Sequence, residues 1–313
     1  MSRALVFPGQ GSQAVGMGRE LAASLVTARE TFEEIDEALH QHLSRLMFEG
    51  PEADLTLTEN AQPALMAVSL AVMRVLERDC GFELKRHAAY VAGHSLGEYS
   101  ALAAAGAFIV PDAARLLKRR GLAMQRAVPV GVGAMAALLG LEIEEARKVA
   151  ALAAQGEVCD CANDNGPGQV VVSGNVAAVE RAVAIAAERG ARRSIMLPVS
   201  APFHCALMAP AAREMEEALA TAALNEPVVP LVANVTATPV QNPDDIRRLL
   251  VEQVTGLVRW RECVTAMREA GVEEIAEIGA GRTLSALVKR IDREIATVTV
   301  GTPSDIDAFV KRM

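Results

Sequence analysis

The sequence predicts an α/β fold in which a small α/β unit is inserted into a larger α/β domain. Short apolar runs with strand character alternate with longer segments of helical periodicity along the chain. Between residues 133 and 199 the expected elements follow the order β-α-β-β-α-β, which is the split βαβ arrangement. We therefore assign residues 127–199 to the inserted unit and residues 1–126 and 200–313 to the larger domain.

The larger domain is expected to begin with a short buried strand, followed by a glycine-rich loop. Helices and strands then alternate on both sides of the insertion. The expected strands cover residues 4–7, 90–91, 229–234 and 274–278. The expected helices cover residues 18–46, 61–77, 96–105, 112–127, 208–223, 243–253, 261–270 and 283–291.

Inside the insertion, strand-like runs are separated by turn residues and by two helical segments. The first helix is expected at residues 144–155. The second follows Asn175, a residue type favoured at the N-cap, and is closed by Gly190. The strands are expected at residues 133–141, 158–162, 169–173 and 193–199.

Composition and charge narrow the class of protein. Half of the 313 residues are hydrophobic and 22% are charged, as in a globular protein. The net charge of −8 argues against nucleic acid or an anionic membrane as the main partner. No apolar run reaches the roughly 18 residues of a membrane span, and the first residues lack a secretory pattern. Five cysteines without CxxC pairing indicate free thiols, no zinc site and a cytoplasmic location.

The segment Gly93-His94-Ser95-Leu96-Gly97 lies between an expected strand and an expected helix. This Gly-x-Ser-x-Gly pattern is typical of a nucleophile elbow. Its glycines leave room for a tight turn that a Cβ would obstruct. The turn presents the Ser95 hydroxyl at a helix N-terminus, where unpaired N–H groups favour developing negative charge.

A nucleophilic serine needs a base, and histidine is the usual one. The chain has five histidines, and His94 is a poor partner because neighbours in a sharp turn point apart. His40, His42 and His87 lie in polar segments, whereas His204 lies on a loop directly after the insertion. No histidine follows position 204 and no acid is obviously placed to orient it. We therefore expect a Ser–His dyad whose histidine is oriented by a backbone carbonyl or an amide side chain.

The loop after the first strand, Gly9-Gln10-Gly11-Ser12-Gln13-Ala14, has two interpretations. It satisfies the dinucleotide-binding fingerprint, but the residues that should form that motif's second strand are helical. A glycine-rich loop after a strand can equally supply a backbone N–H to an oxyanion hole. We favour the second interpretation.

Arg120 lies in the middle of an apolar helical stripe that includes Leu117, Ala123 and Met124. An unpaired buried charge is very costly, so the guanidinium must find an anion. That anion is either a carboxylate of the protein or a substrate carboxylate held by two parallel hydrogen bonds.

Three motifs together resemble one family over essentially the whole chain. They are Phe7-Pro8-Gly9-Gln10-Gly11-Ser12-Gln13, Gly93-His94-Ser95-Leu96-Gly97-Glu98 and Pro202-Phe203-His204. The chain resembles the malonyl-CoA:acyl-carrier-protein transacylase family, the acyltransferases of bacterial type II fatty-acid synthesis. The resemblance implies an α/β-hydrolase-like core with an inserted ferredoxin-like subdomain.

The resemblance also implies roles for individual residues. Ser95 matches the nucleophile and His204 the general base. Gln10 and Leu96 match the backbone donors of the oxyanion hole. The main-chain carbonyl of Gln253 matches the group that orients the histidine.

Three further positions match substrate-binding residues of the family. Arg120 matches the arginine that pairs with the malonyl carboxylate. Gln62 matches a motif position near the active site. Phe203 matches a residue associated with selectivity for malonyl over methylmalonyl groups.

The implied reaction moves a malonyl group from malonyl-CoA to the phosphopantetheine thiol of acyl carrier protein. CoA and phosphopantetheine would be parts of the substrates, with no bound cofactor or metal, and the enzyme would be a monomer. A thioester or carboxylester hydrolase, or the transacylase component of a malonate decarboxylase system, remains an alternative. An acidic carrier protein would need a local basic patch, for which there are three candidates: Arg115-Lys118-Arg119, Arg189-Arg192-Arg193 and Lys289-Arg290-Arg293.

Overall fold

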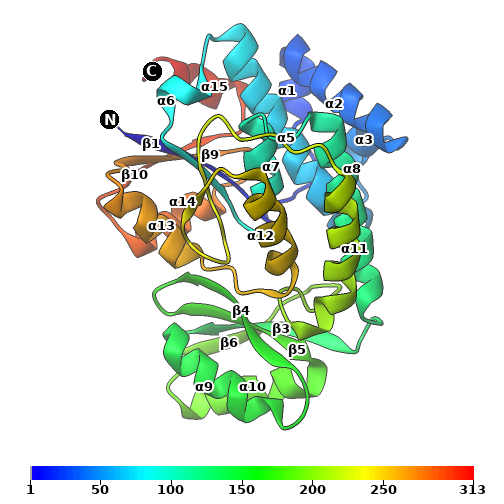
Figure 1. Cartoon of the computed structure of the whole chain (residues 1–313), viewed down its shortest axis with the longest axis vertical. Coiled ribbons are helices and arrows are strands. Elements are labelled where there is room, and N and C mark those ends of the chain that lie inside the picture. Colours follow the sequence, from blue (N-terminus) through cyan, green and yellow to red (C-terminus); the bar gives the residue numbers. More distant parts are fainter. Residues whose placement is uncertain (1) are drawn as a thin grey trace.

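A six-stranded sheet forms the centre of the larger domain in the computed structural model, which describes residues 2–313 (Figure 1). Its strands are parallel except for the last, which pairs antiparallel at one edge. In spatial order they are β10 (Ala296–Val300), β9 (Glu274–Ile278), β1 (Arg3–Phe7), β2 (Tyr90–Gly93), β7 (Leu231–Val232) and β8 (Pro239–Val240). The carboxyl ends of β1 and β2 therefore lie side by side, with Phe7 opposite Gly93.

Helices cover both faces of this sheet because its strands are apolar on both sides. Leu5 and Phe7 of β1 belong to a core cluster shared with α5 (Thr58–Asp79), α7 (Gly97–Ala104) and α8 (Val110–Ala127). Ala4 and Val6 of the same strand belong to a separate cluster on the other face. That cluster is shared with α13 (Trp260–Glu269) and α14 (Thr283–Ile291).

The remaining helices of the larger domain surround this core (Figure 1). α12 (Pro243–Thr255) packs against α11 (Ala209–Thr221), which in turn packs against α8. The others are α1 (Arg19–Ser24), α2 (Val26–Leu39), α3 (Leu43–Glu49), α4 (Glu52–Thr56), α6 (Leu84–His87), the 3₁₀ turn η1 (Ala206–Met208) and α15 (Pro303–Val310).

A second, antiparallel sheet has the spatial order β4-β5-β3-β6. Its strands and two helices are β3 (Gly133–Leu139), α9 (Ile143–Ala154), β4 (Cys159–Gly166), β5 (Gln169–Asn175), α10 (Val176–Glu188) and β6 (Arg193–Met196). This connectivity and order are ferredoxin-like. Ala136 and Leu138 face α9 and α10, whereas Met135 and Ala137 on the other side join the core of the larger domain.

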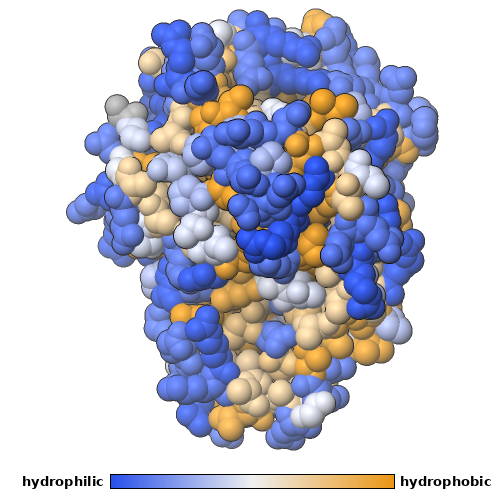
Figure 2. All heavy atoms as spheres, in the orientation of Figure 1, coloured by the Kyte–Doolittle hydropathy of each residue, from blue (hydrophilic) through white to orange (hydrophobic). Residues whose placement is uncertain are grey.

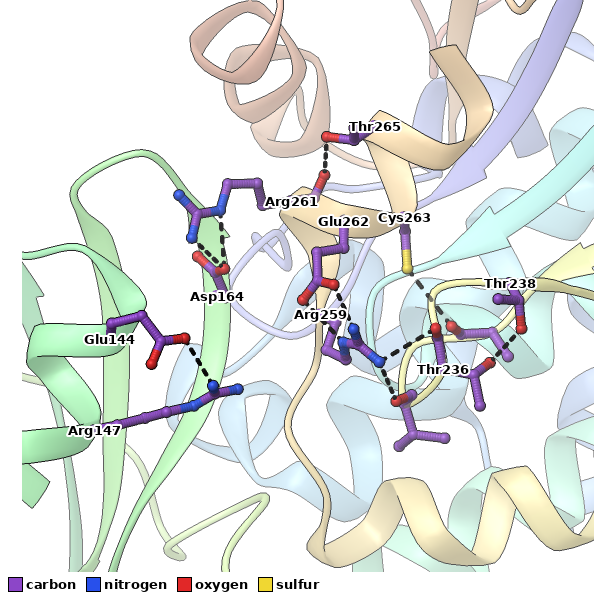
Figure 3. Close-up of polar contacts among 12 residues, drawn as sticks. Glu144, Arg147, Asp164, Thr236, Thr238, Arg259, Arg261, Glu262, Cys263 and Thr265 are labelled. Atoms are coloured by element: carbon purple, nitrogen blue, oxygen red, sulfur yellow. Dashed lines mark hydrogen bonds and ion pairs between the residues drawn. The ribbon is translucent and has the colours of Figure 1, made fainter. Parts of the chain in front are cut away.

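Strand β4 attaches the small sheet to the larger domain next to α13 (Figure 3). The backbone N–H of Asp164 donates to the carbonyl of Val258 at 2.9 Å. The buried carboxylate of Asp164 also forms an ion pair with Arg261 at 2.9 Å, and Arg261 reaches Glu142 on the small subdomain. These contacts fix β4, and the loop that follows it, beside the carboxyl end of the central sheet.

The expected fold class, an α/β-hydrolase-like core with an inserted ferredoxin-like subdomain, is confirmed. Several local expectations differ from the structure. The helix expected at residues 18–46 is divided into α1, α2 and α3, because Leu25 is extended and His40 adopts a left-handed backbone conformation. Strand β10 and helix α15 were not expected. The strand expected at residues 229–234 is reduced to Leu231–Val232, because the following residues turn into a loop. Asn175 does precede α10, but its side chain accepts the Val158 N–H at 2.9 Å instead of capping the helix.

Hydrophilic side chains cover α12, while apolar side chains reach the surface between the two subdomains (Figure 2). Val130, Val132 and Met196, at the ends of β3 and β6, are among the exposed hydrophobic residues. Within residues 2–313 no helix combines the length and the apolar character needed to span a membrane.

Candidate active site

Ser95 lies in a sharp turn between β2 and α7, with a backbone φ of 53°. The turn brings three backbone segments into contact. A Cβ on Gly93 would lie 1.9 Å from the carbonyl carbon of Gly97, and one on Gly97 would lie 2.3 Å from the Phe7 oxygen. Only glycine fits at either position, so the Gly-x-Ser-x-Gly spacing is a packing requirement of this elbow.

His204 is the partner of Ser95. Its Nε2 lies 2.8 Å from Ser95 Oγ, and its Nδ1 lies 2.8 Å from the main-chain oxygen of Gln253. A carbonyl can only accept, so Nδ1 carries the proton and Nε2 is free to accept one from Ser95. Burial, and then the charge of Arg120, lower the pKa of His204 to about 3, so the ring is neutral at neutral pH.

The Arg120 side chain enters the site from α8 and is 1% exposed. Its Nη2 donates to Ser95 Oγ at 3.1 Å and to Gln253 Oε1 at 2.7 Å. Its Nη1 donates to Gln62 Oε1 at 2.8 Å. All three acceptors are uncharged, and no carboxylate among residues 2–313 forms an ion pair with Arg120. The sequence left two anions open for Arg120, a protein carboxylate or a substrate carboxylate. Within the part of the chain that it describes, the structure excludes a protein carboxylate in direct contact.

Close packing of α8 against the start of α5 brings Arg120 to Gln62. A Cβ on the next residue, Gly121, would lie 2.5 Å from the Glu59 Cα and 2.7 Å from the Thr58 oxygen. Gln62 is held in turn, because its amide nitrogen donates to Thr58 Oγ1 at 3.0 Å. The guanidinium thus lies in a fixed amide-lined position.

The backbone N–H groups of Gln10 and Leu96 follow the adjacent carboxyl ends of β1 and β2. Neither N–H donates to an acceptor within the described part of the chain. The loop of Gln10 is anchored by Thr58, whose hydroxyl donates to Gln10 Oε1 at 2.9 Å. An oxyanion hole is built from free backbone donors of this kind.

Two residues with roles in this arrangement were not singled out from the sequence. Asn234 accepts the Ser95 N–H through Oδ1 at 2.8 Å and donates through Nδ2 to the Gly93 oxygen at 2.7 Å. Glu98, 2% exposed, accepts hydrogen bonds from the Asn234 N–H and from the Gln253 side chain. The available signal for Glu98 was that it is the one charged residue of the helix that follows Ser95.

The other expected site residues lie nearby. Phe203 is buried in the main core cluster directly before His204, in the loop that leaves the small subdomain. His94 points away from Ser95, and its Nε2 lies 2.9 Å from Asn165 Oδ1 at the end of β4. No group of three or more His, Cys, Asp or Glu side chains in residues 2–313 is arranged to hold a metal ion.

A serine elbow, a neutral histidine and a pair of free backbone donors define a serine acyl-transfer enzyme. The acyl transferase domain family matches residues 4–303. The malonyl CoA-acyl carrier protein transacylase of Bacillus subtilis is 43% identical over 99% of this chain and 96% of its own length. That of Escherichia coli K12 is 45% identical over 98% of both chains.

Solved structures agree with these relatives. The acyl-carrier-protein S-malonyltransferase of Bartonella henselae has a TM-score of 0.98 and 52% identity, covering 100% of this chain and 99% of its own. A malonyl-transacylase in complex with a type II PKS acyl-carrier protein has a TM-score of 0.97 and 40% identity over the whole of both chains. The chain belongs to the malonyl CoA-acyl carrier protein transacylases within the acyl transferase domain family.

Proposed function

We propose that this enzyme transfers a malonyl group from malonyl-CoA to the phosphopantetheine thiol of acyl carrier protein, through a malonyl ester of Ser95. One observation carries the choice of acyl group. Ser95 Oγ lies between the base His204 and a buried arginine that has no ion-pair partner among the described residues. A malonyl carboxylate would supply the anion that Arg120 lacks. The planar guanidinium could hold both carboxylate oxygens at once, through two parallel hydrogen bonds.

In the first half-reaction, Ser95 Oγ attacks the thioester carbonyl carbon of malonyl-CoA while His204 Nε2 takes its proton. The N–H groups of Gln10 and Leu96 hold the oxyanion of the tetrahedral intermediate. The carbon–sulfur bond then breaks, and the CoA sulfur leaves as a thiol with the proton from His204. The product is a malonyl-serine ester.

The second half-reaction is the reverse with a different thiol. The phosphopantetheine thiol of the carrier protein gives its proton to His204 and attacks the ester carbonyl. Ser95 Oγ leaves and takes the proton back. Neither step as written calls for a cofactor, because acyl transfer changes no oxidation state and Ser95 itself carries the malonyl group between the two thiols. The donor and the acceptor carry the same phosphopantetheine arm, so one site can serve both half-reactions.

Arg120 also connects substrate choice to the chemistry. Its positive charge is the second cause, after burial, of the low pKa of His204. A carboxylate bound to Arg120 would offset that charge and raise the basicity of His204. A malonyl substrate therefore both pairs with Arg120 and makes proton removal from Ser95 easier.

The test is to trap radiolabelled malonyl on the protein. Wild type incubated with malonyl-CoA alone should retain label after denaturation, and Ser95→Ala should retain none. Label on Ser95→Ala would exclude the serine mechanism. Adding carrier protein should move the label to its thiol. Release of free malonate at the same rate with and without carrier protein would instead indicate a hydrolase, and transfer only to another acceptor would favour the decarboxylase component.

The unpaired cations indicate where an acidic carrier protein would dock. Arg115, Lys118 and Arg119 all have carboxylate partners, so that candidate patch is already neutralised. Arg290, by contrast, forms no ion pair within residues 2–313, and the same holds for the exposed Lys289 and Arg293 of its cluster. In the remaining cluster Arg192 and Arg193 are also unpaired within the described residues, whereas Arg189 pairs with Glu145.

Helix α14 runs from the Gln10 loop to the small subdomain and carries Lys289 and Arg290 in its last turn. At its start, Ser12 of the Gln10 loop donates to Thr283 at 3.3 Å. At its end, Arg290 donates to Gln169 on the small subdomain at 2.7 Å. α14 therefore bridges the two subdomains next to the oxyanion-hole loop, and we propose that its cations receive the anionic carrier end of the phosphopantetheine arm.

The expected compartment and oligomeric state also remain proposals. The five cysteines are all free in the structure, which agrees with a reducing compartment such as the cytoplasm.

A further inference from the structure

We propose that Glu98 is a positioning residue for the transfer reaction. Through Asn234 and Gln253 it holds Ser95, His204 and Arg120 in their positions relative to one another. The inference rests on the proposed function, since it concerns the same site. It assigns a role to a buried acid that takes no part in the steps described above.

Each oxygen of the Glu98 carboxylate holds one intermediary. Oε1 accepts the backbone N–H of Asn234 at 2.6 Å, and Oε2 accepts from Nε2 of Gln253. No lysine or arginine in residues 2–313 forms an ion pair with this carboxylate. Its two N–H donors are therefore the interactions that compensate its burial.

Asn234 connects Glu98 to the elbow. The Asn234 side chain accepts from the Ser95 N–H and donates to the Gly93 oxygen, so it clamps the turn on both sides of position 94. The hydrogen bond from the Asn234 backbone N–H to Glu98 fixes the position of Asn234 relative to α7. Glu98 thus supports the strained backbone at Ser95, whose φ of 53° must be held by its surroundings.

Gln253 connects Glu98 to the other two groups. The Gln253 Nε2 donates to Glu98 and to the main-chain oxygen of Ser95. The Gln253 Oε1 must therefore face the opposite way, toward Arg120. Its main-chain oxygen accepts from His204. Because a carboxylate can only accept, Glu98 fixes which end of the amide meets the guanidinium.

The arrangement needs the ionised form of Glu98, since a proton on either oxygen would face an N–H donor. Burial raises the pKa of Glu98 to about 7, opposed by the Asn234 and Gln253 hydrogen bonds and by Arg120. The charged or titratable groups around it are Arg120 on α8, Tyr99 on α7 and Cys263 on α13. Burial raises the pKa of Tyr99 to about 12, and that of Cys263 is also raised, so both stay neutral near pH 7.

The experiment compares Glu98→Gln with a matched control, Glu274→Gln. Glu274 is equally buried, with hydrogen bonds to Arg3 and Arg312, but lies at the amino end of β9, away from the site. The readouts are the acylation rate of Ser95 with malonyl-CoA and acetyl-CoA from pH 5 to 9. Thermal unfolding of each variant is measured alongside.

In Glu98→Gln either the Asn234 N–H or the Gln253 Nε2 faces an amide NH₂, which cannot accept its hydrogen bond. We expect kcat/KM for malonyl-CoA to fall about 10- to 100-fold, the range for losing one hydrogen bond to a charged group. The preference for malonyl over acetyl should fall with it, because Arg120 loses its fixed acceptor. The acid limb near pH 7 in the wild-type profile should disappear. Glu98→Asp should restore part of the rate, and Glu274→Gln should keep the wild-type preference and profile.

Equal malonyl preference and pH profile in Glu98→Gln and Glu274→Gln would overturn the proposal. If Glu98→Gln fails to fold, Glu98→Asp decides the matter: it keeps the carboxylate but shortens its reach to Asn234 and Gln253, and a wild-type rate and malonyl preference in that variant would overturn the proposal. Failure of the proposed function has a different signature, because no malonyl would then be trapped on Ser95 in the wild type.

Discussion

Replacing Arg120 by methionine separates the charge of this side chain from most of its volume. The side chain is buried and forms no ion pair within residues 2–313, so a substrate carboxylate would be the first to contact it directly; Glu98 acts on its charge only at longer range. The variant removes both guanidinium nitrogens that donate into the site. The predicted loss should therefore depend on whether the acyl group carries a carboxylate.

The magnitude follows from the contacts. Two charge-assisted hydrogen bonds to a carboxylate, at about 1.5 to 3 kcal/mol each, give about 3 to 6 kcal/mol. Part of this is offset, because wild-type Arg120 must release Ser95 and Gln253 when substrate binds. A net loss of about 3 to 4 kcal/mol corresponds to about 100- to 1000-fold in kcat/KM for malonyl-CoA.

Acetyl-CoA should behave differently. It has no carboxylate to lose, and removing the charge beside His204 relieves one cause of that residue's low pKa. We expect the acylation rate with acetyl-CoA to change by less than about tenfold, or to rise.

The assay is single-turnover acylation of Ser95 with each substrate. Arg119→Met is the matched control, since Arg119 is the next residue outward and pairs with Glu214 on the surface. It should leave both rates near the wild-type values. A loss of equal size for malonyl and acetyl groups in Arg120→Met would refute a substrate-binding role and leave Arg120 a structural residue.

Two further predictions concern the elbow and the carrier protein. Gly97→Ala places a Cβ 2.3 Å from the Phe7 oxygen and should lower the free energy of unfolding by about 3 kcal/mol, measured by urea titration. Gly81→Ala, with open space around it and a φ of +71°, should cost only about 1 to 2 kcal/mol, and similar values would contradict the packing requirement. Arg290→Glu should raise KM for carrier protein and for malonyl-CoA, but not for malonyl-pantetheine, which lacks the anionic end. The control Arg78→Glu, an exposed cation at the end of α5, should change none of these, and a KM unchanged by Arg290→Glu would remove α14 as the docking surface.

The sequence alone determined those features that are encoded locally. The glycine spacing around Ser95 specifies a turn that only glycine can make, and apolar periodicity specifies which helix face is buried. For this reason the elbow, the inward position of Arg120 and the ferredoxin-like order of the insertion could all be predicted. His204 could be singled out because few histidines compete with it and because it directly follows the insertion.

Tertiary structure decided how these groups meet. Gln253 lies 49 residues from His204 and 133 from Arg120, and Asn234 lies 136 residues from Glu98. No local pattern encodes such pairs, because they depend on the order of strands in the sheet and on the packing of α8 and α12 around it. The same holds for the surface cations, whose sequence clusters look alike until folding gives carboxylate partners to some and leaves those of α14 unpaired.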